Sequence, residues 1–142
     1  MKRAKEILED KGHDVWSMDQ SACVFDAIKL MAEKEIGALI VMDGERVAGI
    51  LSERDYTRKV ILMGRTSQQT LIEEIMSKEV ISVSPGETVK ECMTLMTERH
   101  IRHLPVMDEG RLMGMLSIGD LVKAIIADQQ FTIEQLEGYI NG

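Results

Sequence analysis

The chain contains the same sequence pattern twice, and this duplication limits its fold more than any other feature. Residues 15–55 align without a gap on residues 80–120, an offset of 65 residues, with about 16 of the 41 positions identical. A repeat of this length that occurs only twice is too long for a solenoid. It predicts a duplicated half-domain whose two halves pack face to face.

Each repeat predicts the same order of elements, β-α-β-β-α, and therefore a mixed α/β (α+β) fold. The apolar spacing predicts strands near 15–18, 38–42 and 47–51 in the first repeat, and near 80–83, 103–107 and 112–116 in the second. A helical turn at Arg3–Glu9 and a C-terminal stretch at Phe131–Ile140 flank the pair. Because residues 62–72 carry the break, we expect the first repeat in 1–62 and the second in 63–142, together forming one compact module.

Composition narrows the class of protein. The 142 residues carry a formal charge of −7, which argues against a nucleic-acid partner. No apolar run approaches the ~20 residues of a membrane span, and the N-terminal residues lack the apolar segment of a signal peptide. Only Cys23 and Cys92 are present, both in helix-like apolar stretches, so we expect packed thiols in a reducing cytoplasm rather than disulfides.

The motif Gly-x-x-Ser-x-x-Asp occurs at the same place in both repeats. It spans Gly49, Ser52 and Asp55 in the first, and Gly114, Ser117 and Asp120 in the second. Each copy lies where a strand turns into a helix, and a helix N-terminus exposes amide groups that bind phosphate. The Asp can accept hydrogen bonds from a ribose diol. For one copy alone, a helix-capping box explains the Ser and Asp equally well.

Basic residues near the first motif are candidates to bind phosphate. Arg54, Arg58 and Lys59 follow Ser52, and Arg102 lies in the second repeat. Arg54 falls in the first turn of a helix, where the dipole disfavours a cation, which indicates a use for it. Arg58 and Lys59 are equally explained by a solvated basic face.

Other chemistry-bearing residues form no recognisable catalytic set. No Ser/His/Asp or Cys/His arrangement is visible, and the glycine-rich segments have neither Walker nor Rossmann form, so we expect no enzyme. The nearby pair His100 and His103 has no cysteine cluster, and we expect no metal. Trp16 fits stacking on a purine and covering the domain edge equally well.

The two motifs, the segment Arg102–Val106 and the hydrophobic frame make nearly the whole chain resemble a tandem pair of cystathionine β-synthase (CBS) domains, or Bateman module. Two segments, Ser52–Lys59 and Phe131–Ile140, further resemble the small stand-alone bacterial and plant proteins of this family. The resemblance implies two repeats related by a pseudo-two-fold axis. It also implies a cleft that binds AMP, ADP, ATP or NAD(H), and sometimes S-adenosylmethionine.

The resemblance implies two nucleotide sites, in which the Ser lies near phosphate and the Asp holds the ribose. One is anchored by Ser117 and Asp120, with the base near Ile81, Ser82, Val83, His103, Leu104 and Pro105. The other is anchored by Ser52 and Asp55, with the base near Trp16, Met18, Gly37 and Ala38. Because the repeats differ around the base, we expect unequal affinities and favour the Asp120 site, with AMP as the ligand.

The expected function is a regulatory adenine-nucleotide-binding module that senses energy or redox state and signals to an unidentified partner protein. The resemblance also implies a homodimer formed through the helices. One alternative is a structural or interaction protein with an empty or S-adenosylmethionine-binding cleft. A weaker alternative is a small hydrolase acting on nucleotides.

Overall fold

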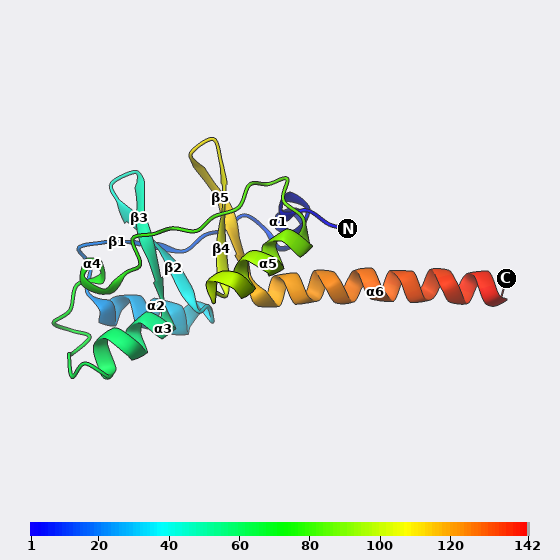
Figure 1. The fold of residues 1–142 in the computed structure, drawn as a ribbon. Helices are drawn as coiled ribbons and strands as arrows, with labels where there is room; N and C mark the ends of the chain where they lie inside the picture. Colours follow the sequence, from blue (N-terminus) through cyan, green and yellow to red (C-terminus); the bar gives the residue numbers. More distant parts are fainter. Residues whose placement is uncertain (142) are drawn as a thin grey trace. The chain divides into compact units, whose positions relative to one another are not determined.

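The computed structural model describes residues 1–141, which form two compact units (Figure 1). The continuous unit is Val15–Val80, and the split unit combines Met1–Asp14 with Ile81–Gly142. These bounds differ from the repeat limits of 1–62 and 63–142, because the N-terminal helix packs with the second repeat and residues 63–80 pack with the first. Each unit has its own hydrophobic core.

The continuous unit contains a three-stranded sheet in the order β1-β2-β3. Strand β1 pairs with β2 in parallel, and β2 pairs with β3 in an antiparallel hairpin. Helix α2 contacts β2 and α3, and α3 runs directly into a π-helical turn, η1. The elements are β1 (Ser17–Asp19), α2 (Val24–Lys34), β2 (Ala38–Asp43), β3 (Arg46–Ser52), α3 (Glu53–Tyr56), η1 (Thr57–Ile61) and α4 (Ile72–Ile75).

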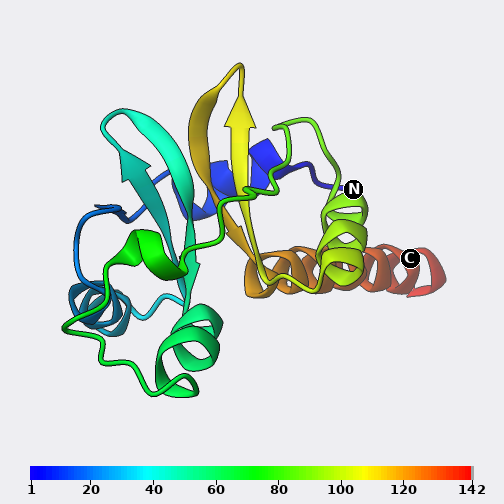
Figure 2. The same cartoon turned by 60° about the vertical axis from the view of Figure 1, so that its left-hand side comes forward.

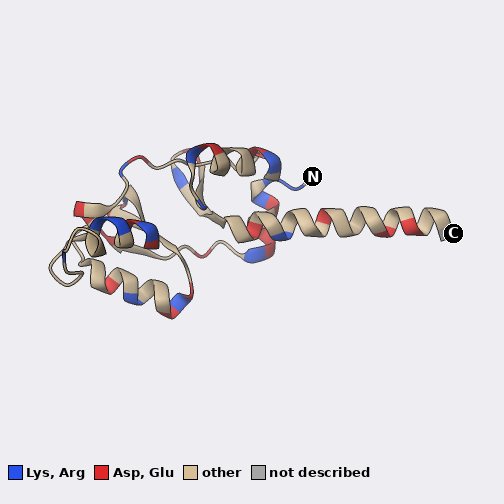
Figure 3. Cartoon of the chain, turned by 60° about the horizontal axis from the view of Figure 1, so that its bottom comes forward, with Lys and Arg blue, Asp and Glu red and all other residues tan. Residues whose placement is uncertain are grey.

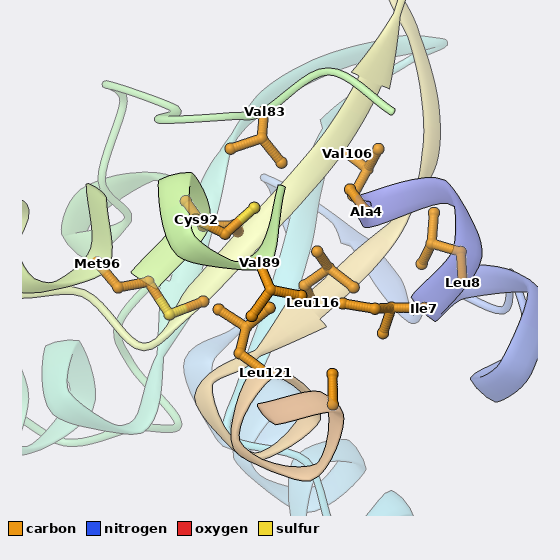
Figure 4. Close-up of a cluster of buried hydrophobic side chains, with 12 residues drawn as sticks. Ala4, Ile7, Leu8, Val83, Val89, Cys92, Met96, Val106, Leu116 and Leu121 are labelled. Carbon is orange, nitrogen blue, oxygen red and sulfur yellow. The ribbon is translucent and has the colours of Figure 1, made fainter. Parts of the chain in front are cut away.

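The split unit is built on the hairpin of β4 and β5, which helices α5 and α6 accompany (Figure 2). Helix α1 contacts β5 and α6, so the first residues of the chain complete this core. Buried side chains from all five elements converge there (Figure 4). The elements are α1 (Ala4–Lys11), α5 (Val89–Arg99), β4 (His103–Asp108), β5 (Arg111–Ser117) and α6 (Ile118–Asn141).

The duplication extends to the way the helices end. The residue that caps the C-terminus of α2 is Glu35 and the one that caps α5 is His100; they lie 65 residues apart and both have a φ of 55°. In both, the backbone amide of this left-handed residue donates to the helix, to Met31 in one case and Met96 in the other. The α-β-β-α order occurs in both repeats, preceded by β1 in the first and by a single bridge at Val83 in the second, and it confirms the predicted mixed α+β fold class.

The first strand of the second repeat is shorter than predicted. Instead of a strand over 80–83, only Val83 forms a parallel bridge, to Val106. In the first repeat the amide of Ile40 donates to the carbonyl of Trp16 at 3.1 Å. The matching residue in the second repeat is Pro105, which has no N–H to donate, so the pairing cannot extend.

The C-terminal stretch Phe131–Ile140 is not a separate flanking element. It continues the helix that begins after Ser117, so α6 is one helix of 24 residues. Within the described residues, no helix combines the length and the apolar character that a membrane crossing requires.

Candidate functional site

Both Gly-x-x-Ser-x-x-Asp motifs adopt the same capping geometry. In the split unit the Ser117 amide donates to Oδ2 of Asp120 at 2.8 Å, and the Asp120 amide donates to Oγ of Ser117 at 3.2 Å. In the continuous unit the Ser52 and Asp55 pair makes the same two bonds, at 2.9 and 3.2 Å. The capping role is therefore present in both copies. Capping does not use both oxygens of the Asp120 carboxylate. The contacts that the structure describes for this carboxylate all involve Oδ2.

Strand register brings several predicted base-contacting residues next to each motif. Ala38 pairs with Ser52, and His103 pairs with Ser117. In addition, the carbonyl of Gly37 accepts from the Glu53 amide at 3.1 Å, and the carbonyl of Arg102 accepts from the Ile118 amide at 2.9 Å. The start of the second strand thus lies beside the helix N-terminus in each unit.

Lys11 is a residue near the second motif that sequence reasoning missed. It is the last residue of α1, and its ammonium lies 2.7 Å from Oδ2 of Asp120 and 2.8 Å from the carbonyl oxygen of Met115. Lys11 precedes Asp120 by 109 residues in the sequence. The one available signal was indirect: the position in the second repeat that matches Lys59 is Ala124, so the second motif lacks a lysine four residues after its aspartate.

Lys59 was predicted as a phosphate ligand, but in the structure it already has protein partners. Its ammonium lies 3.3 Å from Oδ1 of Asp55 and donates to the carbonyl of Ile75 at 2.9 Å. Each motif aspartate therefore has one lysine beside it.

Electrostatics around Asp120 keep it ionised. Burial alone would raise the pKa of the Asp120 carboxyl, but hydrogen bonds from the Lys11 ammonium and the Ser117 amide outweigh burial and hold the pKa below its ordinary value. The pKa of His103 is lowered, first by burial and then by the nearby Lys11 charge. At neutral pH an anionic carboxylate and a neutral imidazole therefore lie near each other.

The glycine of each motif serves packing. A Cβ on Gly114 would lie 2.6 Å from Cδ2 of Leu8 in α1, and a Cβ on Gly49 would lie 2.6 Å from the carbonyl oxygen of Ser77. Gly114 thus lets α1 lie close against β5, which brings Lys11 within reach of Asp120. Sequence reasoning treated these glycines as part of a phosphate motif, whereas their closest constraint comes from a neighbouring segment.

The remaining predicted residues of the continuous unit lie in different environments. Arg54 and Arg58 are exposed on α3 and η1. Trp16 is partly exposed, and the Lys34 ammonium lies 4.4 Å from its ring centroid, so one face of the indole is occupied by a cation. Met18 packs against the core of this unit.

In the split unit, three predicted residues have buried side chains. Val83, Leu104 and Pro105 are buried, and Val83 and Leu104 belong to the hydrophobic core. Ile81 is half-buried against that core, and Ser82 is exposed. The backbone groups of Val83 are also in use, because its amide donates to the carbonyl of Pro105 at 3.0 Å and its carbonyl accepts from the Met107 amide at 2.9 Å.

The described residues contain no group of three or more His, Cys, Asp or Glu side chains placed to hold a metal ion. Both cysteines are free, and Cys92 is buried. Burial raises the pKa of the Cys92 thiol to about 11, with the charges of Glu87 and Glu91 adding to the effect.

Two relatives match this chain over most of its length. A signal-transduction protein with CBS domains from Burkholderia ambifaria, so described from its solved structure, is 54% identical, with a TM-score of 0.88 over 93% of this chain and 99% of its own. The CBS domain-containing protein CBSX3, mitochondrial, of Arabidopsis thaliana is 41% identical over 124 residues, 84% of this chain. The chain spans 60% of that plant protein's length.

A third comparison, with the CBS domain pair of protein MJ0100, shows the fold alone. That structure is 22% identical with a TM-score of 0.79, covers 90% of this chain and 98% of its own, and was solved with 5′-methylthioadenosine and S-adenosyl-L-methionine. None of these three proteins is named as an enzyme. The family model of the CBS domain matches residues 20–61 and 72–127, one segment in each repeat. The chain belongs to the CBS domain family, as a tandem pair.

Proposed function

We propose that this protein is a regulatory module that binds an adenine nucleotide through its motif aspartates and transmits the bound state to a partner protein. The observation that carries the proposal is the Asp120 carboxylate. It is held ionised at a helix N-terminus, only 17% of its side chain is exposed, and its contacts leave Oδ1 to accept from a ribose diol. The ligands in the MJ0100 structure, which both contain adenosine, support this class of ligand.

Phosphate recognition is the second part of the proposal. Helix α6 begins beside Ser117, and the first amides of a long helix attract anions. Lys11 adds a cation within reach of the same turn. A nucleotide would place its ribose on Asp120 and its phosphate toward Ser117, and AMP is the ligand that we favour, with ADP, ATP and NAD(H) as further candidates. The Ser52 and Asp55 motif would form the second, weaker site.

Calorimetry on purified protein tests this proposal. The ligand panel is AMP, ADP, ATP, NAD(H), S-adenosylmethionine and adenosine, and the variant is Asp120→Ala. Loss of charge-assisted hydrogen bonds should cost about 1.5–3 kcal/mol, or roughly 10–150-fold in Kd. Asp55→Ala should cost less.

Asp120→Ala also removes a helix cap, so a matched control is needed. Thr88 caps α5 by accepting from the Glu91 amide at 3.2 Å, and α5 carries neither motif. Thr88→Ala should therefore lower stability by a similar ~1 kcal/mol and leave nucleotide affinity unchanged. Equal effects of both variants on Kd, or no binding of any panel member by the wild type, would contradict the proposal.

A purely structural role for the motif is the second candidate, because both copies form complete capping boxes. Under this alternative the whole panel leaves the melting temperature unchanged. Under the nucleotide proposal, a ligand at 100 times Kd adds about 2.7 kcal/mol, which is roughly 5–10 °C in Tm for a chain of this size. Product analysis after long incubation tests for hydrolysis, which we do not expect.

The regulatory role also implies partners and a compartment. We propose a homodimer, with light scattering expected to report twice the chain mass of 16.0 kDa, and an unidentified protein that responds to the nucleotide-bound state. The two free thiols support a reducing cytoplasm as the location, although the Arabidopsis relative is named as mitochondrial. Cell fractionation tests the location.

A further inference from the structure

Lys11 places a positive charge directly at the Asp120 motif. Its ammonium lies 2.7 Å from Oδ2 of Asp120 and donates to the Met115 carbonyl at 2.8 Å, and these contacts use two of the three N–H groups that a lysine carries. A basic residue at the end of α1 thus meets an acidic one in the first turn of α6 (Figure 3). Because 35% of the Lys11 side chain is exposed, a bound molecule can reach this charge.

The segment around Lys11 is anchored to the split unit on both sides. Before it, the Ala4 amide donates to the carbonyl of Glu87 at 2.8 Å, and α1 contributes three buried side chains to the core of this unit. After it, Nδ1 of His13 lies 2.9 Å from the carbonyl oxygen of Met113. The fold therefore holds the ammonium in place before any ligand arrives.

Three charged residues act together at this motif. Beyond the effect of burial, Lys11 and Arg102 lower the pKa of His103 and Asp120 raises it, so all three charges are felt at the same point. One negative and two positive charges make the motif net positive, and without Lys11 it would be neutral. Lys123 in α6 is exposed and is not among the groups that shift the pKa of Asp120.

The group at the 5′ position of a bound nucleoside lies within range of the Lys11 charge. Under the proposed function, on which this inference rests, the ribose diol bonds Asp120, and the 5′ group is attached to the same sugar ring. Its separation from the ammonium is comparable with the Debye length of about 8 Å at physiological ionic strength, so salt screens their interaction only in part. A 5′ phosphate is attracted and can accept the remaining N–H group of Lys11, whereas a sulfonium is repelled.

We propose that Lys11 selects the ligand of the Asp120 motif by charge, favouring adenosine ligands with an anionic 5′ group and rejecting those with a cationic one. Adenosine phosphates belong to the first class and S-adenosylmethionine to the second. Without Lys11, the charge nearest to the ribose would be the Asp120 carboxylate, which repels a phosphate and attracts a sulfonium. Lys11 thus reverses the preference that the carboxylate alone would give.

An NMR titration that observes each motif separately tests the inference. The Ser117 amide reports on the Asp120 motif, because it donates to Oδ2 of Asp120 at 2.8 Å, and the Ser52 amide reports on the other motif in the same way. The ligands are AMP, adenosine, 5′-methylthioadenosine and S-adenosylmethionine, and the proteins are the wild type and Lys11→Met. All four ligands carry the same base and ribose diol, so a change in Asp120 itself alters their affinities by the same factor and cancels in the ratios between ligands.

The affinity ratios between ligands carry the expected result. In the wild type the Ser117 amide should report AMP as tighter than adenosine, and S-adenosylmethionine as weaker than 5′-methylthioadenosine. In Lys11→Met the advantage of AMP over adenosine should fall about tenfold, and S-adenosylmethionine should gain about threefold relative to 5′-methylthioadenosine. The Ser52 amide should report unchanged ratios, and Lys11→Arg, which keeps the charge, should retain the wild-type preference.

Lys123 supplies the matched control, because it is an exposed cation three residues after Asp120 in the same helix. Lys123→Met should change the ratios by less than about twofold, since an exposed charge is screened by water and salt. The amide spectra also establish that each variant is folded.

Two results would overturn the inference while leaving nucleotide binding intact. Equal changes for all four ligands in Lys11→Met would show that Lys11 acts only by positioning Asp120 or α1. Ratios that change as much in Lys123→Met would show that any cation of this unit has the same effect. Binding of none of the four ligands by the wild type would instead contradict the proposed function, and the inference with it.

Discussion

Lys11 contacts Asp120 in the same way as Lys59 contacts Asp55: each ammonium lies against one motif carboxylate and donates to one backbone carbonyl. The two lysines are not equivalent in the sequence repeat. Lys59 lies four residues after its aspartate, whereas Lys11 comes from α1, before the first repeat begins. The same local electrostatic arrangement is thus reached by two routes, which indicates that a cation beside the motif carboxylate matters to both units.

Replacing Lys11 with Met should raise the pKa of Asp120, because burial remains while the largest opposing interaction is gone. The lowered pKa of Asp120 in the wild type adds stability above the ordinary Asp pKa of about 3.9, and this contribution is lost as the pH falls through the folded-state pKa. Lys11→Met should therefore cost about 1 kcal/mol at neutral pH and progressively less in acid.

Carbon-detected NMR titration of the Asp120 carboxyl measures this shift directly, and urea unfolding at several pH values measures its effect on stability. Lys5 lies on the same helix and is exposed, so Lys5→Met is the matched control and should change neither quantity. An Asp120 pKa that stays the same in Lys11→Met would show that the Ser117 amide alone determines it.

The repeat predicted the fold because identical patterns at a fixed offset produce identical local structure. The order of elements, the two hairpins and the position of each motif at a strand-to-helix junction all follow from the pattern. What it could not predict depends on differences between the repeats or on contacts outside them. Pro105 shortens one strand pairing by removing a donor, and that effect is visible only once Ile40 is seen to donate.

The candidate site likewise contains some residues that the sequence repeat predicted and others that it could not predict. Residues joined by strand register, such as Ala38 with Ser52 and His103 with Ser117, were predicted together and lie together. Lys11 was missed because no periodicity links α1 to β5. The packing role of Gly114 was missed for the same reason, since only the folded chain brings Leu8 against it.

His103 should make stability depend on pH near neutrality. Its lowered pKa means that the folded state binds a proton less readily than the unfolded chain, whose His pKa is about 6.5. The free energy of unfolding should therefore fall as the pH drops below about 6.5, because protonation of the histidine then favours the unfolded chain. Urea unfolding between pH 5 and pH 8 should show a shallower loss in His103→Asn, and identical slopes in both proteins would contradict the expectation.

Arg54 should act on phosphate rather than on folding. A cation in the first turn of a helix is disfavoured by ~0.3–1 kcal/mol, and a bound phosphate reverses that sign. Arg54→Ala should leave the stability of the free protein nearly unchanged and weaken AMP by at least ~1.5 kcal/mol, about tenfold, while hardly affecting adenosine. Calorimetry with both ligands decides it, with Lys29→Ala, an exposed cation of the same unit, as the control.

The result for Arg54 has two informative alternatives. Equal losses for AMP and adenosine would mean that Arg54 shapes the surroundings of the base or ribose. An unchanged AMP affinity would mean that Arg54 belongs to a solvated basic face and does not bind the phosphate. Added salt should weaken AMP binding more in the wild type than in the variant, because the variant has lost a charge that salt screens.

The two motif glycines should differ in their tolerance of a methyl group. A Cβ on Gly49 would meet the Ser77 carbonyl oxygen at 2.6 Å and the Met76 sulfur at 2.9 Å, and the first of these is backbone that bridges to Ile50. The three atoms nearest to a Cβ on Gly114 all belong to the Leu8 side chain, the closest being Cδ2 at 2.6 Å. Since a side chain moves more easily than a paired backbone, Gly49→Ala should cost about 3 kcal/mol and Gly114→Ala about 1 kcal/mol.

Thermal and urea unfolding of the two glycine variants measure this difference, with Gly138→Ala as the control. Gly138 lies within α6 with no atom near its added Cβ, so alanine there should be neutral or stabilising by ~0.5–1 kcal/mol. Gly114→Ala should have one further effect that Gly49→Ala lacks. Because it displaces Leu8, it should move α1 and with it Lys11, and the pKa of Asp120 should rise as in Lys11→Met. A Gly114→Ala protein with a wild-type Asp120 pKa would show that the position of Lys11 does not depend on the close packing of α1 against β5.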